Sequence, residues 1–315
     1  MTTTQLETGF DRETTAAEVV EGVDLSGRFA IVTGGYSGIG LEMTRALASA
    51  GADVLVPARR PDVARSALGP LAEVTSLDLT DPRSIRRFAS HLVDRGRPVD
   101  VLIHGAGVMR RTRDLVGPGW ETHLAVHHLG PHLLTSLVLP VVADVGRVVM
   151  LSSAGHFLSD IRWDDLHFGR AVEYDPWVAY GQSKTACALA AIYLDDALAE
   201  RGGHAFAVHP GSILTPLQRE IPVEEQRRLG WIDAGGRPPA GFKNTEQGAA
   251  TAVWAATSPL LDAHGGAYLQ DCNLAAAATS DDMLIGGVKP WAQDRASAER
   301  LRVLSEKLMG ALVEN

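Results

Sequence analysis

Tyr180 and Lys184 are the two residues of this chain whose types and spacing most clearly suggest chemistry. Residues four apart on a helix lie on the same face, so the phenol and the ammonium would point the same way. A phenol by itself is a poor proton donor or acceptor at neutral pH. A neighbouring cation favours release of its proton. The pair therefore predicts a tyrosine tuned for proton transfer.

A glycine-rich segment, Thr33-Gly-Gly-Tyr-Ser-Gly-Ile-Gly40, follows the apolar stretch 29–33. Its glycines would permit a tight turn and a close approach of the backbone to a pyrophosphate, held at the N-terminus of a helix that starts near Ile39. Each motif alone is a weak signal. In this order, on a chain of alternating strands and helices, they predict hydride transfer to or from a carbonyl at a dinucleotide site.

The composition limits the class of protein. The chain has 315 residues, 45% hydrophobic and 21% charged, and a formal charge of −9 that argues against a basic nucleic-acid-binding surface. Two cysteines, Cys187 and Cys272, predict neither a disulfide framework nor a cysteine-rich zinc site, and Cys187 is expected to be a packing residue. Residues 1–24 lack the pattern of a secretory signal, and Leu133 to Val145 is too short to span a bilayer. A cytoplasmic enzyme is expected.

The alternation of apolar strands with helices predicts an α/β fold in one doubly wound (Rossmann) domain, residues 27–315, with a parallel seven-stranded sheet and helices on both faces. Strands are expected at 28–33, 53–57, 72–77, 99–104, 147–152, 204–209 and 266–270. Helices are expected near 38–50, 61–67, 81–95, 119–140, 174–202 and 244–258.

Four further segments complete the prediction. Residues 1–26 form an N-terminal extension with a short helix from Thr15 to Glu21. Insertions are expected at 154–173 and 212–243. The second, rich in proline and glycine with a helical piece at 223–229, is predicted to be a substrate lid. Residues 290–312 carry Leu301, Leu304 and Leu308 on one helical stripe and should pack back on the body.

The pattern T-G-x-x-x-G-x-G followed by Y-x-x-x-K resembles the short-chain dehydrogenase/reductase family over nearly the whole chain from Leu25 onward. The long gap before Tyr180, with Trp163-Asp-Asp-Leu-His-Phe and Tyr174-Asp-Pro-Trp, is similar to the retinol-dehydrogenase-like and bacterial oxidoreductase branch. The resemblance implies that Ser153 fixes the substrate carbonyl oxygen, that Tyr180 transfers the proton and that Lys184 assists Tyr180 and holds the ribose. Ser153 rather than Ser152 occupies the family's catalytic position, and Ser152 is expected to cap backbone groups.

The residues near the end of the second strand favour NADP(H) over NAD(H). NAD sites of this type carry a carboxylate about 20 residues after the glycines, whereas Ala58 is followed here by Arg59 and Arg60. A guanidinium suits a 2′-phosphate, and Asp62 is expected in the first turn of a helix. Together with the resemblance, this predicts cofactor contacts from Gly34, Tyr36, Ser37, Gly38, Ile39, Gly40, Arg59, Asp78, Leu79, Gly105, Ala106, Gly107, Tyr180, Lys184, Pro210, Gly211, Ile213 and Thr215.

Two expected asparagines of the family are missing. This chain has Gly105 at the position after the fourth strand where the family has a structural asparagine. The side-chain hydrogen bonds by which that asparagine braces the sheet would be lost. His127 occupies the family's fourth catalytic position, so the proton relay either persists with an altered pH dependence or is lost. If His127 takes over the relay, an extra ionisation is expected between about pH 5 and 8. Replacement of His127 by the family's asparagine should then flatten the acidic limb of the pH–rate profile. His123, His127, His128 and His132 invite a metal interpretation, but no acidic third ligand is evident nearby, and no metal is expected.

Three functions remain open from the sequence. The first is an NADP-dependent oxidoreductase that interconverts an alcohol and a ketone or aldehyde of a fairly apolar small molecule. The second is a lyase, cyclase or isomerase that uses Tyr180 without net redox change, and the third is a nucleotide-sensing or scaffold protein. Aromatic residues of the insertions either line the substrate pocket or pack loops: Phe157, Trp163, Trp231 and Phe242. No nucleic-acid or membrane partner is expected, and the resemblance implies a homodimer or homotetramer.

Overall fold

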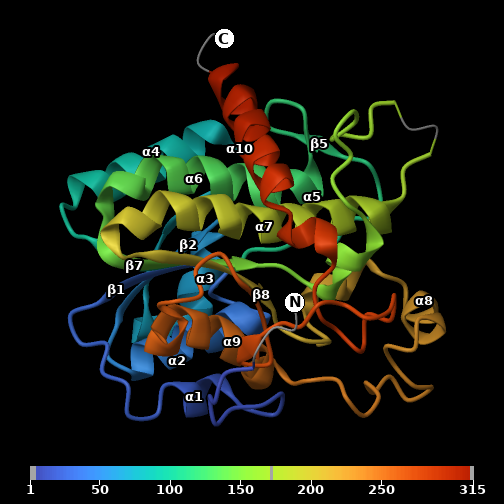
Figure 1. The fold of residues 1–315 in the computed structure, drawn as a ribbon, viewed down its shortest axis with the longest axis horizontal. Coiled ribbons are helices and arrows are strands. Elements are labelled where there is room, and N and C mark those ends of the chain that lie inside the picture. The colour runs from blue at the N-terminus through green and yellow to red at the C-terminus, as the bar shows by residue number, and fades with distance from the viewer. Residues whose placement is uncertain (1–4, 171–172, 313–315) are drawn as a thin grey trace.

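An eight-stranded sheet forms the centre of the computed structural model, which describes residues 5–170 and 173–312 (Figure 1). The strand order is β10-β9-β8-β7-β4-β1-β2-β3, and only β10 is antiparallel to its neighbour. The strands are β1 (Phe29–Thr33), β2 (Asp53–Ala58), β3 (Glu73–Ser76), β4 (Val99–His104), β7 (Val142–Leu151), β8 (His204–His209), β9 (Tyr268–Gln270) and β10 (Asn273–Leu274).

The predicted doubly wound α/β fold is confirmed, and the predicted number of strands is wrong by one. The additional strand, β10, has two residues and turns back on β9 through Asp271 and Cys272, both at positive φ. A two-residue strand is too short to show a hydrophobic period. The central strand β1 is buried along its whole length, as expected where helices cover both faces of a parallel sheet.

Two groups of helices cover the sheet (Figure 1). One face carries α4 (Pro82–Asp94), α6 (Gly130–Val138), α7 (Pro176–Leu198) and α10 (Arg295–Gly310), and the other carries α1 (Ala16–Val19), α2 (Gly38–Ser49), α3 (Pro61–Leu68) and α9 (Thr245–Thr257). Each group contributes to its own hydrophobic core against the sheet. The predicted stripe on α10 is confirmed, because Leu301 is buried and Leu304 and Leu308 pack against the first core.

The helix predicted at 119–140 begins later than expected. Residues 115–121 form a hairpin of β5 (Leu115–Val116) and β6 (Trp120–Glu121), followed by α5 (Thr122–Leu124), a π-helical turn at Ala125–Leu129 and α6. The Glu121 carboxylate starts the helix by accepting hydrogen bonds from two backbone amides. Within the described residues, Thr122–Val141 is the one helical stretch long and apolar enough to cross a membrane, and 72% of its most apolar window is buried inside the fold, as in a core helix.

Helix α7 carries Tyr180 and Lys184 and is buried over most of its length. Asp175 caps its N-terminus by accepting from the amides of Trp177 and Val178, and Pro176 fits the first helical position. Small residues dominate its middle part, which lets the helix pack closely between the sheet, α10 and the insertion before it.

The predicted lid, residues 212–243, contains a 3-10 turn at Pro216–Glu220 and α8 (Val223–Arg228), and it lies beyond one end of the sheet (Figure 1). The N-terminal extension reaches both the lid and the sheet edge. Arg12 donates to the carbonyl of Gly241 at 2.6 Å. Nearer the start of the extension, Leu6 exchanges hydrogen bonds with the side chain of Asn273 in β10.

Candidate active site

A cleft of about 1740 Å³ lies where the carboxyl ends of β1, β4, β7 and β8 meet the lid. Parallel strands bring residues from distant parts of the sequence together at this edge. Every residue predicted to bind cofactor lines this cleft, and so do Ser153, Tyr180 and Lys184. His127 is the one predicted site residue that does not line it.

The glycine segment forms a backbone cradle. Gly34 has φ +72°, and a Cβ atom there would lie 2.8 Å from the Cα atom of Ala106. A Cβ atom on Gly40 would collide with the Gly34 carbonyl. Ser37 precedes α2 without using its side chain to cap the helix. The free helix N-terminus and the space reserved by glycine fit a pyrophosphate.

Arg59 and Arg60 line the cleft directly after β2 and are exposed. Among the described residues, neither side chain is engaged in an ion pair or hydrogen bond. Asp62 lies in the first turn of α3 and pairs with Arg65 at 2.8 Å, as predicted for a helix residue. The cleft therefore offers free cations, with no strand-end carboxylate, at this position.

Tyr180, Lys184 and Ser153 come from α7 and from the end of β7. The Lys184 ammonium donates to the carbonyl of Leu151 at 2.9 Å and lies 5.5 Å from the centre of the Tyr180 ring. The Ser153 hydroxyl accepts from the amide of Gly155 at 3.0 Å. Ser152 is buried and donates to the Lys184 carbonyl at 2.8 Å, as expected for a hydroxyl that caps backbone.

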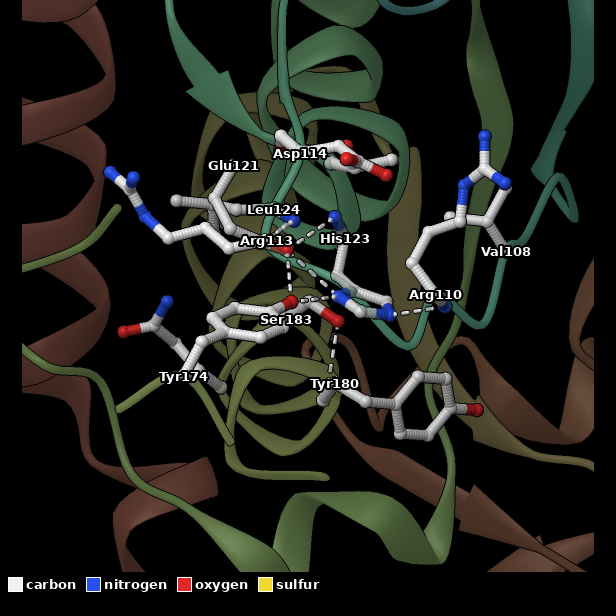
Figure 2. Close-up of polar contacts among 12 residues, drawn as sticks. Val108, Arg110, Arg113, Asp114, Glu121, His123, Leu124, Tyr174, Tyr180 and Ser183 are labelled. Atoms are coloured by element: carbon white, nitrogen blue, oxygen red, sulfur yellow. Dashed lines mark hydrogen bonds and ion pairs between the residues drawn. The ribbon is translucent and has the colours of Figure 1, made fainter. Parts of the chain in front are cut away.

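The Tyr180 ring packs between Gly155 and the imidazoles of His123 and His127. Its ring centre lies 5.7 Å from that of His127 and 6.0 Å from that of His123, both nearly edge-on. A Cβ atom on Gly155 would lie 2.5 Å from the ring atom Cε1 of Tyr180. Figure 2 shows the Tyr180 hydroxyl pointing away from the polar contacts of His123. Packing on both sides thus fixes the direction of the phenol.

His127 does not behave as the sequence predicts. Its Nε2 accepts the amide of Val108 at 3.0 Å, and its Nδ1 lies 2.7 Å from the hydroxyl of Ser183, which itself donates to the Tyr180 carbonyl. These partners require a neutral imidazole with its proton on Nδ1. Burial, together with the nearby Lys184 cation, holds the pKa of His127 well below its usual range. The predicted ionisation of His127 between pH 5 and 8 is therefore wrong.

The loss of the structural asparagine at Gly105 is compensated locally. A Cβ atom at this position would lie 2.9 Å from the Thr33 carbonyl, so the backbone leaves no room for a side chain. Thr33 instead donates its hydroxyl to the carbonyl of Ile103 at 3.4 Å and accepts the amide of Ala106 at 3.2 Å. These bonds brace the junction of β1 and β4 that the asparagine was expected to brace.

The four helical histidines have separate protein partners. His128 bonds Ser305 and His132 bonds Tyr193, whereas His123 and His127 bond backbone amides. In the part of the chain that the structure describes, no group of three or more His, Cys, Asp or Glu side chains is arranged to hold a metal ion.

The side of the cleft next to residues 217–231 is apolar. Met109, Tyr180 and Ile221 form a buried cluster, against which three further side chains pack: Trp177, Leu217 and Trp231. Two of the four predicted aromatic residues, Trp231 and Phe242, line the cleft. The other two pack elsewhere, Phe157 against His156 and Trp163 beneath Arg300.

Comparison with known proteins gives the family. Residues 28–163 match the model of the short chain dehydrogenase family. A probable oxidoreductase of Streptomyces antibioticus is 42% identical over 89% of this chain and 96% of its own length. A short-chain dehydrogenase/reductase of Penicillium roqueforti is 31% identical over 95% and 91%. The chain belongs to the short-chain dehydrogenase/reductase family. A polyprenol dehydrogenase of Mus musculus is 38% identical to this short-chain dehydrogenase over 78% of the chain and 76% of its own length.

Several residues around the cleft of this short-chain dehydrogenase were not predicted. Glu121 could have been found as an acidic N-cap before a helix. Its contact with Tyr174 could not, because Tyr174 is 53 positions away in the sequence. Gly155 carries no local signal, because its importance depends on the Tyr180 ring above it. Arg12 and Lys243 line the cleft from segments outside every motif.

We expect Gly155→Ala to lower kcat of this short-chain dehydrogenase by on the order of 100-fold, because it would displace Tyr180, the predicted proton-transfer residue, and a displacement of about 1 Å at such a group costs that much. The new methyl group must push the Tyr180 ring aside. Steady-state kinetics and cofactor titration measure the effect, and cofactor affinity should persist. Gly310→Ala is the matched control, since nothing lies within 4 Å of that position. An unchanged kcat in Gly155→Ala would mean that the ring position is not critical.

Buried histidines make the stability of this short-chain dehydrogenase sensitive to acid. Burial lowers the pKa of His104 and His209 to about 3 and that of His132 and His156 to about 4. The unfolded chain binds protons at these groups near pH 6.5, while the folded chain does not. Above pH 6.5 these histidines should therefore not change the free energy of unfolding. Below pH 6.5 the free energy of unfolding should decrease as the pH is lowered, by up to about 1.4 kcal/mol per pH unit for each histidine.

Urea unfolding at several pH values between 7.5 and 4.5 measures this dependence. His104→Gln should make it shallower. The control His91→Gln, at an exposed position of α4, should leave it unchanged. A midpoint that does not move with pH in the wild-type protein contradicts the prediction.

Proposed function

We propose that this short-chain dehydrogenase is an NADP(H)-dependent oxidoreductase that interconverts an alcohol and a ketone or aldehyde of a fairly apolar small molecule. The observation that carries the proposal is the common cleft. Tyr180, Lys184 and Ser153 line the same cavity as the glycine cradle, beneath an apolar cluster.

The cofactor fits the residues present. The backbone around Gly34 and Gly38 would hold the pyrophosphate at the N-terminus of α2, and Arg59 would pair with the 2′-phosphate. Lys184 would hold the ribose. When bound, the nicotinamide supplies or accepts the hydride.

The protein's own residues handle the proton and the oxygen. The Ser153 hydroxyl would donate to the substrate oxygen, which orients the reacting carbon. The Tyr180 hydroxyl would give its proton to that oxygen during reduction and take it back during oxidation. The Lys184 ammonium, 5.5 Å from the ring centre, would offset the negative charge that develops on the phenol oxygen in the reductive direction.

The substrate side supports an apolar molecule. Trp177 and Trp231 meet edge to face with ring centres 5.7 Å apart, and Met109 and Ile221 are buried beside Tyr180. Such a lining would offer apolar area to a hydrocarbon. The name of the polyprenol dehydrogenase also describes an alcohol with a hydrocarbon chain as substrate.

The redox proposal is preferred to the lyase, cyclase or isomerase alternative. That alternative depended on the departures at His127 and Gly105. Both positions have structural partners here, and neither adds an acid or base to the cleft.

NADPH should bind more tightly than NADH, because Arg59 is a free cation at the adenosine end. Arg59→Asp should weaken NADPH binding roughly tenfold to a hundredfold, the range for losing a hydrogen bond to a charged group, and should reverse the preference. Fluorescence titration of both cofactors tests this. Arg83→Asp, an exposed charge reversal away from the cleft, is the control. Equal or tighter binding of NADH to the wild-type protein would refute the preference.

Turnover is tested with NADP⁺ and apolar primary and secondary alcohols of increasing chain length, and with NADPH and the corresponding carbonyls, by absorbance of the reduced nicotinamide. Tyr180→Phe should lower the rate by a factor of about 100 to 10,000, because only the proton-transferring oxygen is removed, and should keep cofactor affinity. Substantial activity in Tyr180→Phe would remove this tyrosine from the mechanism. Failure of the wild-type protein with every substrate would favour non-redox chemistry.

A further inference from the structure

Glu121 and His123 form a fully buried pair beside Tyr180 that the proposed chemistry does not use. The Glu121 carboxylate accepts from the backbone amides of His123 at 3.1 Å and Leu124 at 2.9 Å. It also accepts from the Tyr174 hydroxyl and from Nδ1 of His123, each at 2.8 Å (Figure 2). One carboxylate thus joins the start of the α5–α6 helix to the segment that leads into α7.

The hydrogen bonds define the protonation of His123. An ionised carboxylate only accepts, so Nδ1 of His123 carries a proton and donates it to Glu121. Nε2 accepts the backbone amide of Arg110 at 2.9 Å, which leaves no proton on that nitrogen. His123 is therefore a neutral imidazole with one orientation, and Glu121 imposes that orientation.

His123 and His127 hold the same stretch of backbone. His127 accepts the amide of Val108, and His123 accepts the amide of Arg110, two residues further along the loop after β4. Amides two apart on an extended chain point the same way, so two imidazoles on one helix can bind both. Val108 follows the cofactor-lining residues 105–107, whereas Arg110 leads toward the substrate side.

The loop is linked directly to the lid. Arg110 pairs with Glu220 at 2.6 Å and Arg111 with Glu225 at 2.9 Å. Between the cofactor side and these ion pairs, Met109 packs in the cluster with Tyr180 and Ile221. Residues 109–111 thus contact both Tyr180 and the lid.

We propose that Glu121 and His123 are positioning residues for the lid: they fix residues 109–111 and, through the Arg110–Glu220 ion pair, hold residues 216–229 over the substrate side of the cleft. The expected effect of these residues on substrate binding rests on the proposed function. Their expected effect on the mobility of the lid does not depend on the proposed function.

Hydrogen–deuterium exchange of the full chain measures the lid without a substrate. His123→Phe removes the acceptor for the Arg110 amide and should speed exchange of the hydrogen-bonded lid amides roughly fivefold to thirtyfold, the range for a loss of one to two kcal/mol. Suitable reporters are the amides of Ile221, Gln226 and Leu229. His123→Gln offers a carbonyl oxygen to the same amide and should restore slow exchange. Exchange in α4 serves as the internal reference.

Glu220→Gln tests the last link at a half-exposed position that does not threaten folding. It should loosen the lid as well, and the double variant His123→Phe/Glu220→Gln should show less than the sum of the two single effects, because the Arg110–Glu220 ion pair is one of the connections through which His123 holds the lid. Unchanged lid exchange in either single variant, or full additivity in the double variant, would overturn the proposal. If His123→Phe also speeds exchange in α4, its effect is not specific to the lid. The lid exchange of Glu220→Gln and the rescue by His123→Gln then decide whether the proposal holds.

Kinetics with an alcohol found in the turnover screen give a second readout. His123→Phe should raise KM roughly fivefold to thirtyfold and leave the Kd of NADPH unchanged, because the cofactor side of the loop is held by His127. An equal loss of cofactor affinity would indicate a general structural role and contradict the proposal. Absence of any turnover would count against the proposed function alone, since the exchange experiment would still report on the lid.

Discussion

The active-site architecture depends on a requirement of the backbone between residues 105 and 111. This segment leaves the sheet after β4 and crosses the cleft without a neighbouring strand, so its amides need acceptors that no ladder supplies. Thr33 satisfies the amide of Ala106, His127 that of Val108 and His123 that of Arg110. The loop can line the cofactor site, the apolar cluster and the lid because these three side chains hold it from behind.

The same requirement explains why both imidazoles stay neutral. If either ring were protonated, its Nε2–H would face the N–H of a backbone amide, and the hydrogen bond to the loop would be lost. The Nε2 acceptor of His127, near Lys184, also adds no second positive charge there. Burial on its own would raise the pKa of Glu121, but the hydrogen bonds from His123 and from two amides outweigh it and lower that pKa. The charge that Glu121 adds behind His123 is therefore negative.

Much of the fold and of the cleft follows from local sequence. The glycine cradle, Tyr180 with Lys184 and the choice of Ser153 over Ser152 depend on short motifs, and the structure brings all of them to one cavity. Part of the hairpin at 115–121 was predicted as helix, because strands of two residues are too short to show an alternation of apolar and polar residues. The protonation of His127 could not be read from the sequence, since it depends on an amide 19 positions away and on Ser183, 56 positions away.

The N-terminal extension changes how the sheet ends. Gln5 and Leu6 bond Leu274 and Asn273, so part of the chain lies along the outer side of β10, where a further strand could otherwise add. An open edge is a template for pairing with another molecule. A shortened chain that kept every cofactor-lining motif but began near residue 27 would lose this cover. The extension thus covers part of an edge at which a strand of another molecule could otherwise pair.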